Sequence, residues 1–383
     1  MVVSATGQPG VVVSERHNVM EKVTISIAFV NEALECLRTI DPNWIELAVN
    51  AGISPELLET PQARVSARQY CMLWKLIATK MNDEFLGMDS RRMKCGSFTL
   101  LCHSVIHCDI LESAMQRATR FMRIILDGTC SHLLRDGDLA YLVLEDTDEQ
   151  VAVKSNAKMP PKRPFAYGTY LLMLHGLACW LIGRQIPVIR ADFCCREPYF
   201  SGEWRVLFSQ ELHFEQPQTR IIFSAQYLGL QNIQNERTME DFLRSAPASF
   251  LLKDKSSGGL TAQIRRRLRR LRPKEWPGFV SIARSLYLSE TTLRRRLDQE
   301  GQSYRQIMSD LRRDLAIGLL GDTDKSIAEI AEHLGFAEPS AFHRAFKKWT
   351  GSRPGEYRLA SQTTDLAKNA RHDAIPYRRS TFL

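Results

Sequence analysis

The pattern of apolar and polar positions is clearest between Ser326 and Arg358. Apolar residues recur there at the i, i+3, i+4, i+7 spacing of one helical face, namely at Ile327, Ile330, Ala331 and Leu334. Ser326 and Glu329 predict a capping box at the start of this helix. Gly335 predicts its end, because a left-handed residue commonly stops a helix.

A second helix is predicted to follow from Pro339, which suits a first helical position. Phe342 and Phe346 lie one turn apart and are expected to face the first helix. The opposite side carries the polar and cationic residues His343, Arg344, Lys347 and Lys348, and Gly351 and Pro354 end the helix. The segment predicts a helix-turn-helix with its cations directed toward DNA. For this segment alone, a solvated basic helix of another domain is the plainer alternative.

The stretch 279–301 predicts an upstream copy of the same unit. Its first helix has apolar positions at Val280, Ile282, Ala283 and Leu286. Ser289 is a good N-cap for the next helix, in which Leu293 and Leu297 form the core pair and residues 294–296 are all arginine. The amphipathic stretch 304–320 between the units predicts a long helix that holds them apart. Two such recognition helices are expected to enter successive major grooves, about 34 Å apart.

The order of motifs in 259–358 strongly resembles the DNA-binding domain of AraC/XylS-family transcription regulators. The resemblance rests on Ala-Glu-Ile-Ala at 328–331, Gly-Phe at 335–336, Phe-x-Arg-Ala-Phe-Lys at 342–347 and Pro-x-x-Tyr-Arg at 354–358. One departure is Leu-Tyr-Leu at 286–288, where many members carry glycine. The resemblance implies an all-α domain of two helix-turn-helix units joined by a long helix.

The same resemblance assigns DNA-contacting positions. Base reading is implied for Glu290, Thr291, Arg294 and Arg295 on the first recognition helix, and for Pro339, Ser340, His343 and Arg344 on the second. Pro339 has no N–H to donate, so the second helix is expected to read fewer bases and to hold phosphates through Lys347 and Lys348.

The first two-thirds of the chain alternate between helical and strand periods. Helices are predicted over 24–37, 43–58, 66–81, two within 96–125, one over 165–182 and one over 232–251. Strands are predicted over 139–144, 188–194, 212–214 and 220–223. This mixture predicts an α+β domain. The apolar run 165–182 contains His175 and falls short of about 20 residues, so a buried core helix is favoured over a membrane span.

Motifs in the first two-thirds of the chain are less restrictive than those near its end. They are similar to the long arabinose-binding-type N-terminal domain of AraC/XylS members that resemble ornithine-utilisation regulators. They are AGISPELLETPQARV at 51–65, DEFLG at 83–87, the run 96–125 and VLFSQELHFEQPQTRIIFSAQYL at 206–228. The resemblance implies a domain that senses a small-molecule effector and forms a homodimer, in a protein that works with RNA polymerase. The expected organisation is a disordered N-terminus (1–23), a sensor and dimerisation domain (24–250), a polar linker (251–259), the DNA-binding domain (260–358) and a flexible tail (359–383).

The charge distribution separates the two domains. The chain has a net charge of +8, and residues 262–358 contain 20 lysines and arginines against 12 acidic residues, whereas residues 1–261 contain 27 against 29. A locally basic domain implies a polyanionic partner and binding that weakens steeply with salt. All nine cysteines lie before residue 200. An extracellular disulfide framework is not expected, because the chain is long and shows no secretory signal pattern. A bacterial cytoplasmic, nucleoid-associated protein without a membrane partner is expected.

Catalytic and metal-binding patterns are weak. Cys102, His103, His107 and Cys108 form a cluster of suitable residue types, but their spacing is poor for structural zinc. Cys194 and Cys195 are adjacent in a predicted strand and would point to opposite faces. No Gly-rich phosphate loop, H-E-x-x-H or G-x-S-x-G motif is present. We therefore expect no cofactor, no metal and no enzymatic activity.

The preferred hypothesis is a sequence-specific DNA-binding transcription regulator, an effector-responsive activator of metabolic or stress genes. Two alternatives stay open at this stage. One is a DNA-binding module fused to an unrecognised enzyme of the DNA-repair type, although paired cysteines of that kind are missing. The other is an architectural protein without sequence preference, which would protect DNA broadly rather than at one site.

Overall fold

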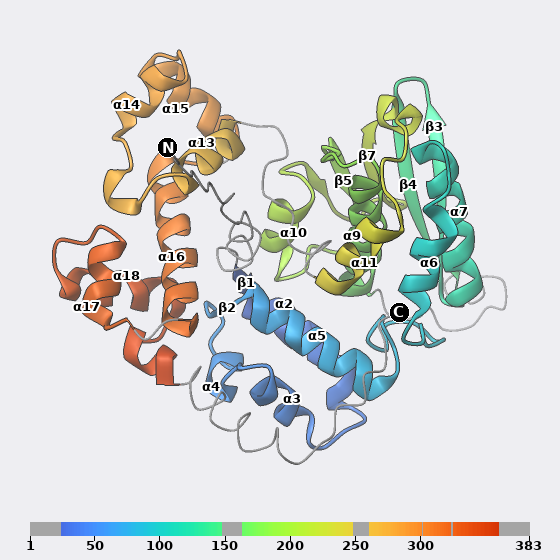
Figure 1. Cartoon of the computed structure of the whole chain (residues 1–383), viewed down its shortest axis with the longest axis horizontal. Helices are drawn as coiled ribbons and strands as arrows, with labels where there is room; N and C mark the ends of the chain where they lie inside the picture. Colours follow the sequence, from blue (N-terminus) through green and yellow to red (C-terminus); the bar gives the residue numbers. More distant parts are fainter. Residues whose placement is uncertain (1–23, 148–162, 248–259, 301, 323–324, 360–383) are drawn as a thin grey trace, which may run out of the picture.

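The computed structural model describes residues 24–147, 163–247, 260–300, 302–322 and 325–359. The predicted disordered N-terminus and the linker 251–259 lie outside these residues, as does the predicted tail except for its first residue. Within the described part, the predicted α+β region and the predicted all-α helix-turn-helix region are both present (Figure 1). The first is called the sensor region below, after its expected role.

A two-stranded ribbon opens the sensor region. Strands β1 (Thr24–Ser26) and β2 (Arg64–Ser66) pair antiparallel and lead directly into helices α2 (Ile27–Arg38) and α5 (Ala67–Met81). The last serine of each strand caps the helix that follows: Ser26 Oγ accepts from the amide of Ala28, and Ser66 forms a capping box with Gln69. The helix predicted over 24–37 therefore begins three residues late, because strand pairing takes its first residues.

The helices between and after the ribbon follow the predicted order with shorter bounds. The segment predicted as one helix over 43–58 forms two, α3 (Trp44–Asn50) and α4 (Pro55–Leu58), because Gly52 between them has a φ of +84°. Helices α6 (Ser97–Val105) and α7 (Leu111–Ile125) confirm the predicted pair within 96–125. The helix predicted over 232–251 is described as α11 (Glu236–Ser245), and residues 248–251 lie outside the described part.

A five-stranded sheet forms the other half of the sensor region, in the order β3-β4-β7-β5-β6. Its strands are β3 (Thr129–Asp136), β4 (Leu139–Asp146), β5 (Arg190–Asp192), β6 (Leu212–His213) and β7 (Thr219–Ser224), and only the β5–β6 pair is parallel among those described. Strand β3 was not predicted. It forms a hairpin with β4, and Gly137 adopts a φ of +55° at the turn.

Helix α9 (Pro164–Leu181) is buried against one face of this sheet, where the hydroxyls of Ser131 and Tyr170 lie 2.7 Å apart. Within the described residues, no helix combines the length and the apolar character that a membrane crossing needs. The prediction of a buried core helix over 165–182 is therefore confirmed.

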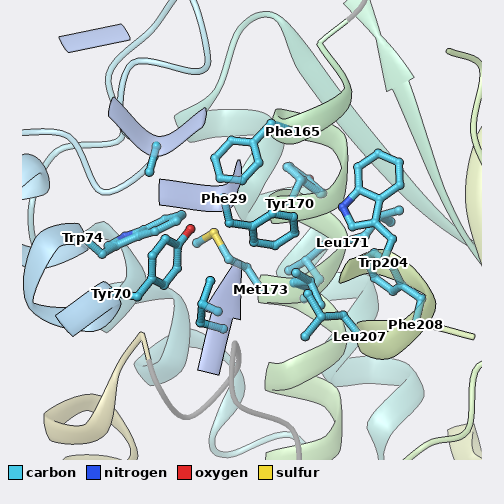
Figure 2. Packing of buried hydrophobic residues seen from close by; sticks show 14 of the residues in the cluster. Phe29, Tyr70, Trp74, Phe165, Tyr170, Leu171, Met173, Trp204, Leu207 and Phe208 are labelled. Atoms are coloured by element: carbon cyan, nitrogen blue, oxygen red, sulfur yellow. The ribbon is translucent and has the colours of Figure 1, made fainter. Parts of the chain in front are cut away.

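Aromatic side chains join the half of the sensor region that contains the two-stranded ribbon to the half that contains the five-stranded sheet (Figure 2). Phe29 of α2 packs edge-on against Phe165 of α9, with ring centroids 5.4 Å apart, and against Phe200 at 5.7 Å. Trp204 of α10 (Ser201–Leu207) stacks on Phe193 at 4.1 Å and lies directly over Gly168, where any Cβ would fall 2.5 Å from the indole nitrogen. Large rings that pack edge to face in this way hold the two halves as one core.

The basic region forms two helix-turn-helix units at the two ends of helix α16 (Tyr304–Asp322) (Figure 1). Helices α13 (Leu260–Arg269), α14 (Phe279–Ser285) and α15 (Glu290–Gln299) share one buried cluster with the start of α16. Helices α17 (Ile327–His333) and α18 (Pro339–Thr350) pack on its other end. With 19 residues at 1.5 Å each, α16 is about 28 Å long.

The first turn departs from the second at one residue. Gly335 follows α17 with a φ of +78°. Tyr287 takes the corresponding place after α14 with a φ of +56°, and the residue is 97% exposed. A left-handed backbone costs a non-glycine residue about 1–2 kcal/mol, and nothing in the burial of Tyr287 offsets it.

We expect Tyr287→Gly to raise the free energy of unfolding by about 0.5–1 kcal/mol, because the relief of strain exceeds the extra chain entropy of glycine. Urea unfolding of the full chain measures the change. Gly335→Ala is the matched control and should destabilise, since its Cβ would meet the Lys274 backbone at 3.2 Å. A Tyr287→Gly variant less stable than the parent would contradict this account.

Candidate nucleic-acid interface

Helix α15 presents its predicted DNA-contacting side chains to solvent. Ser289 caps the helix by accepting from the Thr292 amide at 3.2 Å, as predicted. Leu293 and Leu297 are fully buried and fix which side faces inward. The opposite surface exposes all four predicted contacts, Glu290, Thr291, Arg294 and Arg295.

The guanidinium of Arg294 lies 5.6 Å from the ring centre of Phe279, so a cation–π contact restrains it on the surface. A partly ordered arginine loses less freedom when it binds a base edge. The Arg294 side chain is therefore partly ordered on the exposed surface of α15 before any partner binds.

Helix α18, like α15, buries one apolar side and exposes polar and cationic side chains, but the exposed residues differ. Pro339 occupies its first turn, Gly351 ends it with a φ of +81°, and Phe342 and Phe346 are fully buried, all as predicted. The predicted contacts Ser340, His343, Arg344, Lys347 and Lys348 are exposed. The Ser340 hydroxyl donates to Glu338 at 3.2 Å, which leaves the three cations and His343 as the side chains directed outward.

Further cations on α13 and directly after it were not among the predicted contacts. Arg266, Arg267 and Arg270 are exposed, and Arg267 also donates to the carbonyl of Ser285. Arg265 differs, because it is buried and pairs with Asp310 of α16 at 3.1 Å. The run RRRLRR at 265–270 could have indicated these cations from the sequence. Only the fold shows that Arg265 is buried while other arginines of the run are exposed.

Arg312 of α16 holds the two units together. Its guanidinium lies 5.4 Å from the ring centre of Trp276 in the first unit and 5.7 Å from that of Phe336 in the second. It also donates to the carbonyl of Leu334 at 3.1 Å. Burial lowers the pKa of Arg312 from its usual value. The sequence predicted a spacer helix, and this arginine makes the spacer a fixed joint between the two recognition helices.

The second unit also contacts the sensor region. Residues of α16, α17 and α18 belong to the same continuous apolar core as the sensor helices, whereas the first unit has a core of its own. Thr24 Oγ1 of β1 donates to Asp314 of α16 at 2.6 Å, and the Tyr357 hydroxyl donates to the Arg64 carbonyl of β2 at 2.8 Å. We call these two strands with α16 and Tyr357 the ribbon interface. Nothing in the sequence pattern indicated it.

The four side chains that the sequence offered as a metal-binding cluster do not point to a common site. Cys102 and Cys108 are buried, whereas His103 and His107 face outward and lie 3.6 and 3.3 Å from the carboxylate of Glu236. Burial raises the pKa of the Cys102 thiol above its usual value. Cys194 and Cys195 lie after β5 rather than within it, so the prediction of a strand over 188–194 was too long.

Two protein-family models match the sequence, one in each region of the structure. Residues 45–232 match the arabinose-binding N-terminal domain of AraC transcription regulators, and residues 282–360 match a helix-turn-helix domain. Together the two matched segments cover more than half of the chain. The chain belongs to the AraC family of transcription regulators.

Individual relatives are similar to this AraC-family chain over different shares of its length. It is 28% identical to an ornithine utilization regulator of Pseudomonas aeruginosa over 88% of this chain and 96% of that one. It is 36% identical to the regulator VqsM of the same species, over 32% of this chain and 38% of that one. The chain in the crystal structure of the transcriptional regulator CdpR from P. aeruginosa is 22% identical over 69% of this chain and 82% of that chain, with a TM-score of 0.27.

Proposed function

We propose that this AraC-family regulator reads promoter DNA with both recognition helices and that a small molecule bound by its sensor region controls the output. The observation that carries the proposal is the pair of helices α15 and α18, each with a buried apolar side and an exposed polar and cationic side, fixed at the two ends of α16.

The two helices are proposed to have unequal roles. Arg294 and Arg295 of α15 are suited to bidentate contact with guanine, and Glu290 is suited to accept from cytosine. Lys347 and Lys348 of α18 are suited to phosphate contacts, which position the protein without reading sequence. The exposed arginines on α13 and directly after it add to this electrostatic attraction.

A groove between α9 and α11 is our candidate for the effector site. It has a volume of about 490 Å³, within the usual range for small-molecule sites. Its apolar wall is the stacked pair Trp180 and Phe242, with ring centroids 4.4 Å apart, and its polar wall includes Arg184, Gln185 and Gln234. Aromatic surface beside amides, the cation Arg184 and the carboxylate of Asp241 suits a compact polar metabolite.

The ribbon interface offers a route from the sensor region to DNA. An effector changes output only through different affinities for two states of the protein. We propose that those states differ in how β1 and β2 hold α16 and Tyr357, which would set the position of α18 relative to α15.

Partners beyond DNA are part of the proposal. A homodimer, formed through residues before 250, would place two DNA-binding regions on repeated half-sites, and RNA polymerase would be the partner in activation. The competing enzymatic function predicts that the bound small molecule is chemically changed.

Footprinting of the full chain on its own upstream region, with a reporter assay, tests the proposal. One defined protected site is expected, with a reporter that responds to a small molecule recovered intact by mass spectrometry. Uniform protection along the fragment would support an architectural protein instead. Conversion of the molecule to a product would support an enzyme.

A further inference from the structure

Three side chains with metal-binding chemistry meet on β3 and β4, outside the groove and the DNA interface. Cys130 and Glu145 are directly opposed in the antiparallel ladder, and His132 lies two residues after Cys130 on the same face. Ser131 between them points to the other face, where it meets Tyr170 of α9. The three side chains therefore share the face that turns away from α9, at the β3 edge of the sheet (Figure 1).

The distances between the ligand atoms are close to those of a metal site. Cys130 Sγ lies 3.9 Å from His132 Nε2 and 4.0 Å from Glu145 Oε2, and His132 Nε2 lies 3.7 Å from Glu145 Oε2. In a tetrahedral zinc site with ordinary bond lengths, such pairs are about 3.3–3.6 Å apart. The observed triangle is wider by about 0.4 Å, which small side-chain rotations can close.

The burial of the group suits an ion that enters from one side. Cys130 is 8% exposed, whereas the side chains of His132 and Glu145 are 38% and 29% exposed. Burial and the nearby Glu145 raise the pKa of the Cys130 thiol, against the opposing charge of Arg123. The sulfur is held at the base of the site, and the imidazole and carboxylate border its open side. A water molecule can complete the fourth position.

We propose that Cys130, His132 and Glu145 bind one divalent cation of the zinc class. One sulfur, one nitrogen and one oxygen ligand suit a borderline metal such as zinc rather than magnesium or calcium, which prefer oxygen alone. The Cys130 sulfur–metal bond forms as the S–H bond breaks, and the proton passes to solvent; no electron is transferred. The site is independent of the proposed effector and DNA functions, and an ion there would fasten the edge strand β3 to β4.

Cobalt titration of the tag-free, chelator-treated full chain tests the site, with cobalt as a spectroscopic substitute for zinc. We expect a thiolate-to-cobalt charge-transfer band that saturates at one cobalt per chain and disappears when zinc is added. Cys130→Ser should abolish the band. His132→Asn and Glu145→Gln should weaken cobalt binding by at least about tenfold, since even outer-shell partners of a metal ligand contribute that much.

Two matched controls separate this site from others. Cys95→Ser removes an exposed thiol elsewhere, and Glu236→Gln alters the surface group with His103 and His107, so both variants should keep the band. Circular dichroism confirms that each variant is folded, and His132→Asn, at a half-exposed position, keeps the test usable if Cys130→Ser unfolds. No band at one equivalent, a band that survives in Cys130→Ser, or a band lost equally in the controls would overturn the proposal.

Discussion

Replacing Arg64 with methionine is expected to lower the free energy of unfolding by about 3–5 kcal/mol, the usual cost of removing one partner from a buried ion pair. Arg64 pairs with Glu203 at 2.5 and 3.2 Å, and the two side chains are only 14% and 12% exposed. Its guanidinium also donates twice to Thr24, which in turn donates to Asp314 of α16. The substitution leaves the Glu203 carboxylate buried without its cation and loosens the ribbon interface. Urea unfolding of the full chain measures the loss.

Two further variants identify the cause. The double variant Arg64→Met with Glu203→Leu should recover much of the stability, because no uncompensated charge then remains. Tyr357→Phe removes the hydrogen bond to the Arg64 carbonyl and should cost about 1 kcal/mol. It should alter the effector response of a reporter more than the affinity for DNA. A double variant as unstable as Arg64→Met would show that the ion pair is not the source of the loss.

Replacing Arg294 with alanine is expected to weaken binding to the best DNA site by about 1–3 kcal/mol and to relax the preference at one base pair. Arg294 is exposed on α15, and Phe279 restrains its guanidinium in the unbound protein. The loss falls on specific DNA because a bidentate contact to guanine exists only with the correct base. Competition binding with a set of single-base variants of the footprinted site measures both effects.

Lys347→Ala is the matched control for Arg294→Ala, since both remove one exposed cation from a recognition helix. It should weaken all sequences about equally and reduce the salt dependence of binding by about one ion. If Arg294→Ala weakens specific and random DNA to the same extent, Arg294 contacts phosphate and the assignment of base reading is wrong.

The two helix-turn-helix units and the long helix between them could be predicted from the sequence, whereas no helix was predicted where α13 lies. Its signals are local: the capping box of Ser326 and Glu329, the left-handed Gly335, and the pair Phe342 and Phe346 all act within a few residues. The exposed side of each recognition helix follows from its buried side, so the exposure of the candidate DNA contacts was predictable too. Their roles on DNA stay predictions.

The sensor region was predicted less well because its decisive contacts join distant residues. Strands of three residues carry too little alternation to be recognised, so β1 and β2 were predicted as parts of helices or loops. Strand β3 has eight residues and was missed for another reason: its sequence TCSHLLRD shows no regular alternation of apolar and polar positions. Pairing across 40 residues makes Thr24–Ser26 a strand, and no local propensity reports such a partner.

The sequence by itself determined the family, the two helix-turn-helix units and the concentration of positive charge on them, because helical periodicity, caps and charge are properties of short segments. Only the tertiary structure decided that the second unit shares its core with the sensor region, that Arg312 joins the two units, and that Cys130, His132 and Glu145 meet on one face. Each of these depends on chain segments that approach after folding, and a packed core selects such contacts by shape and burial rather than by sequence spacing.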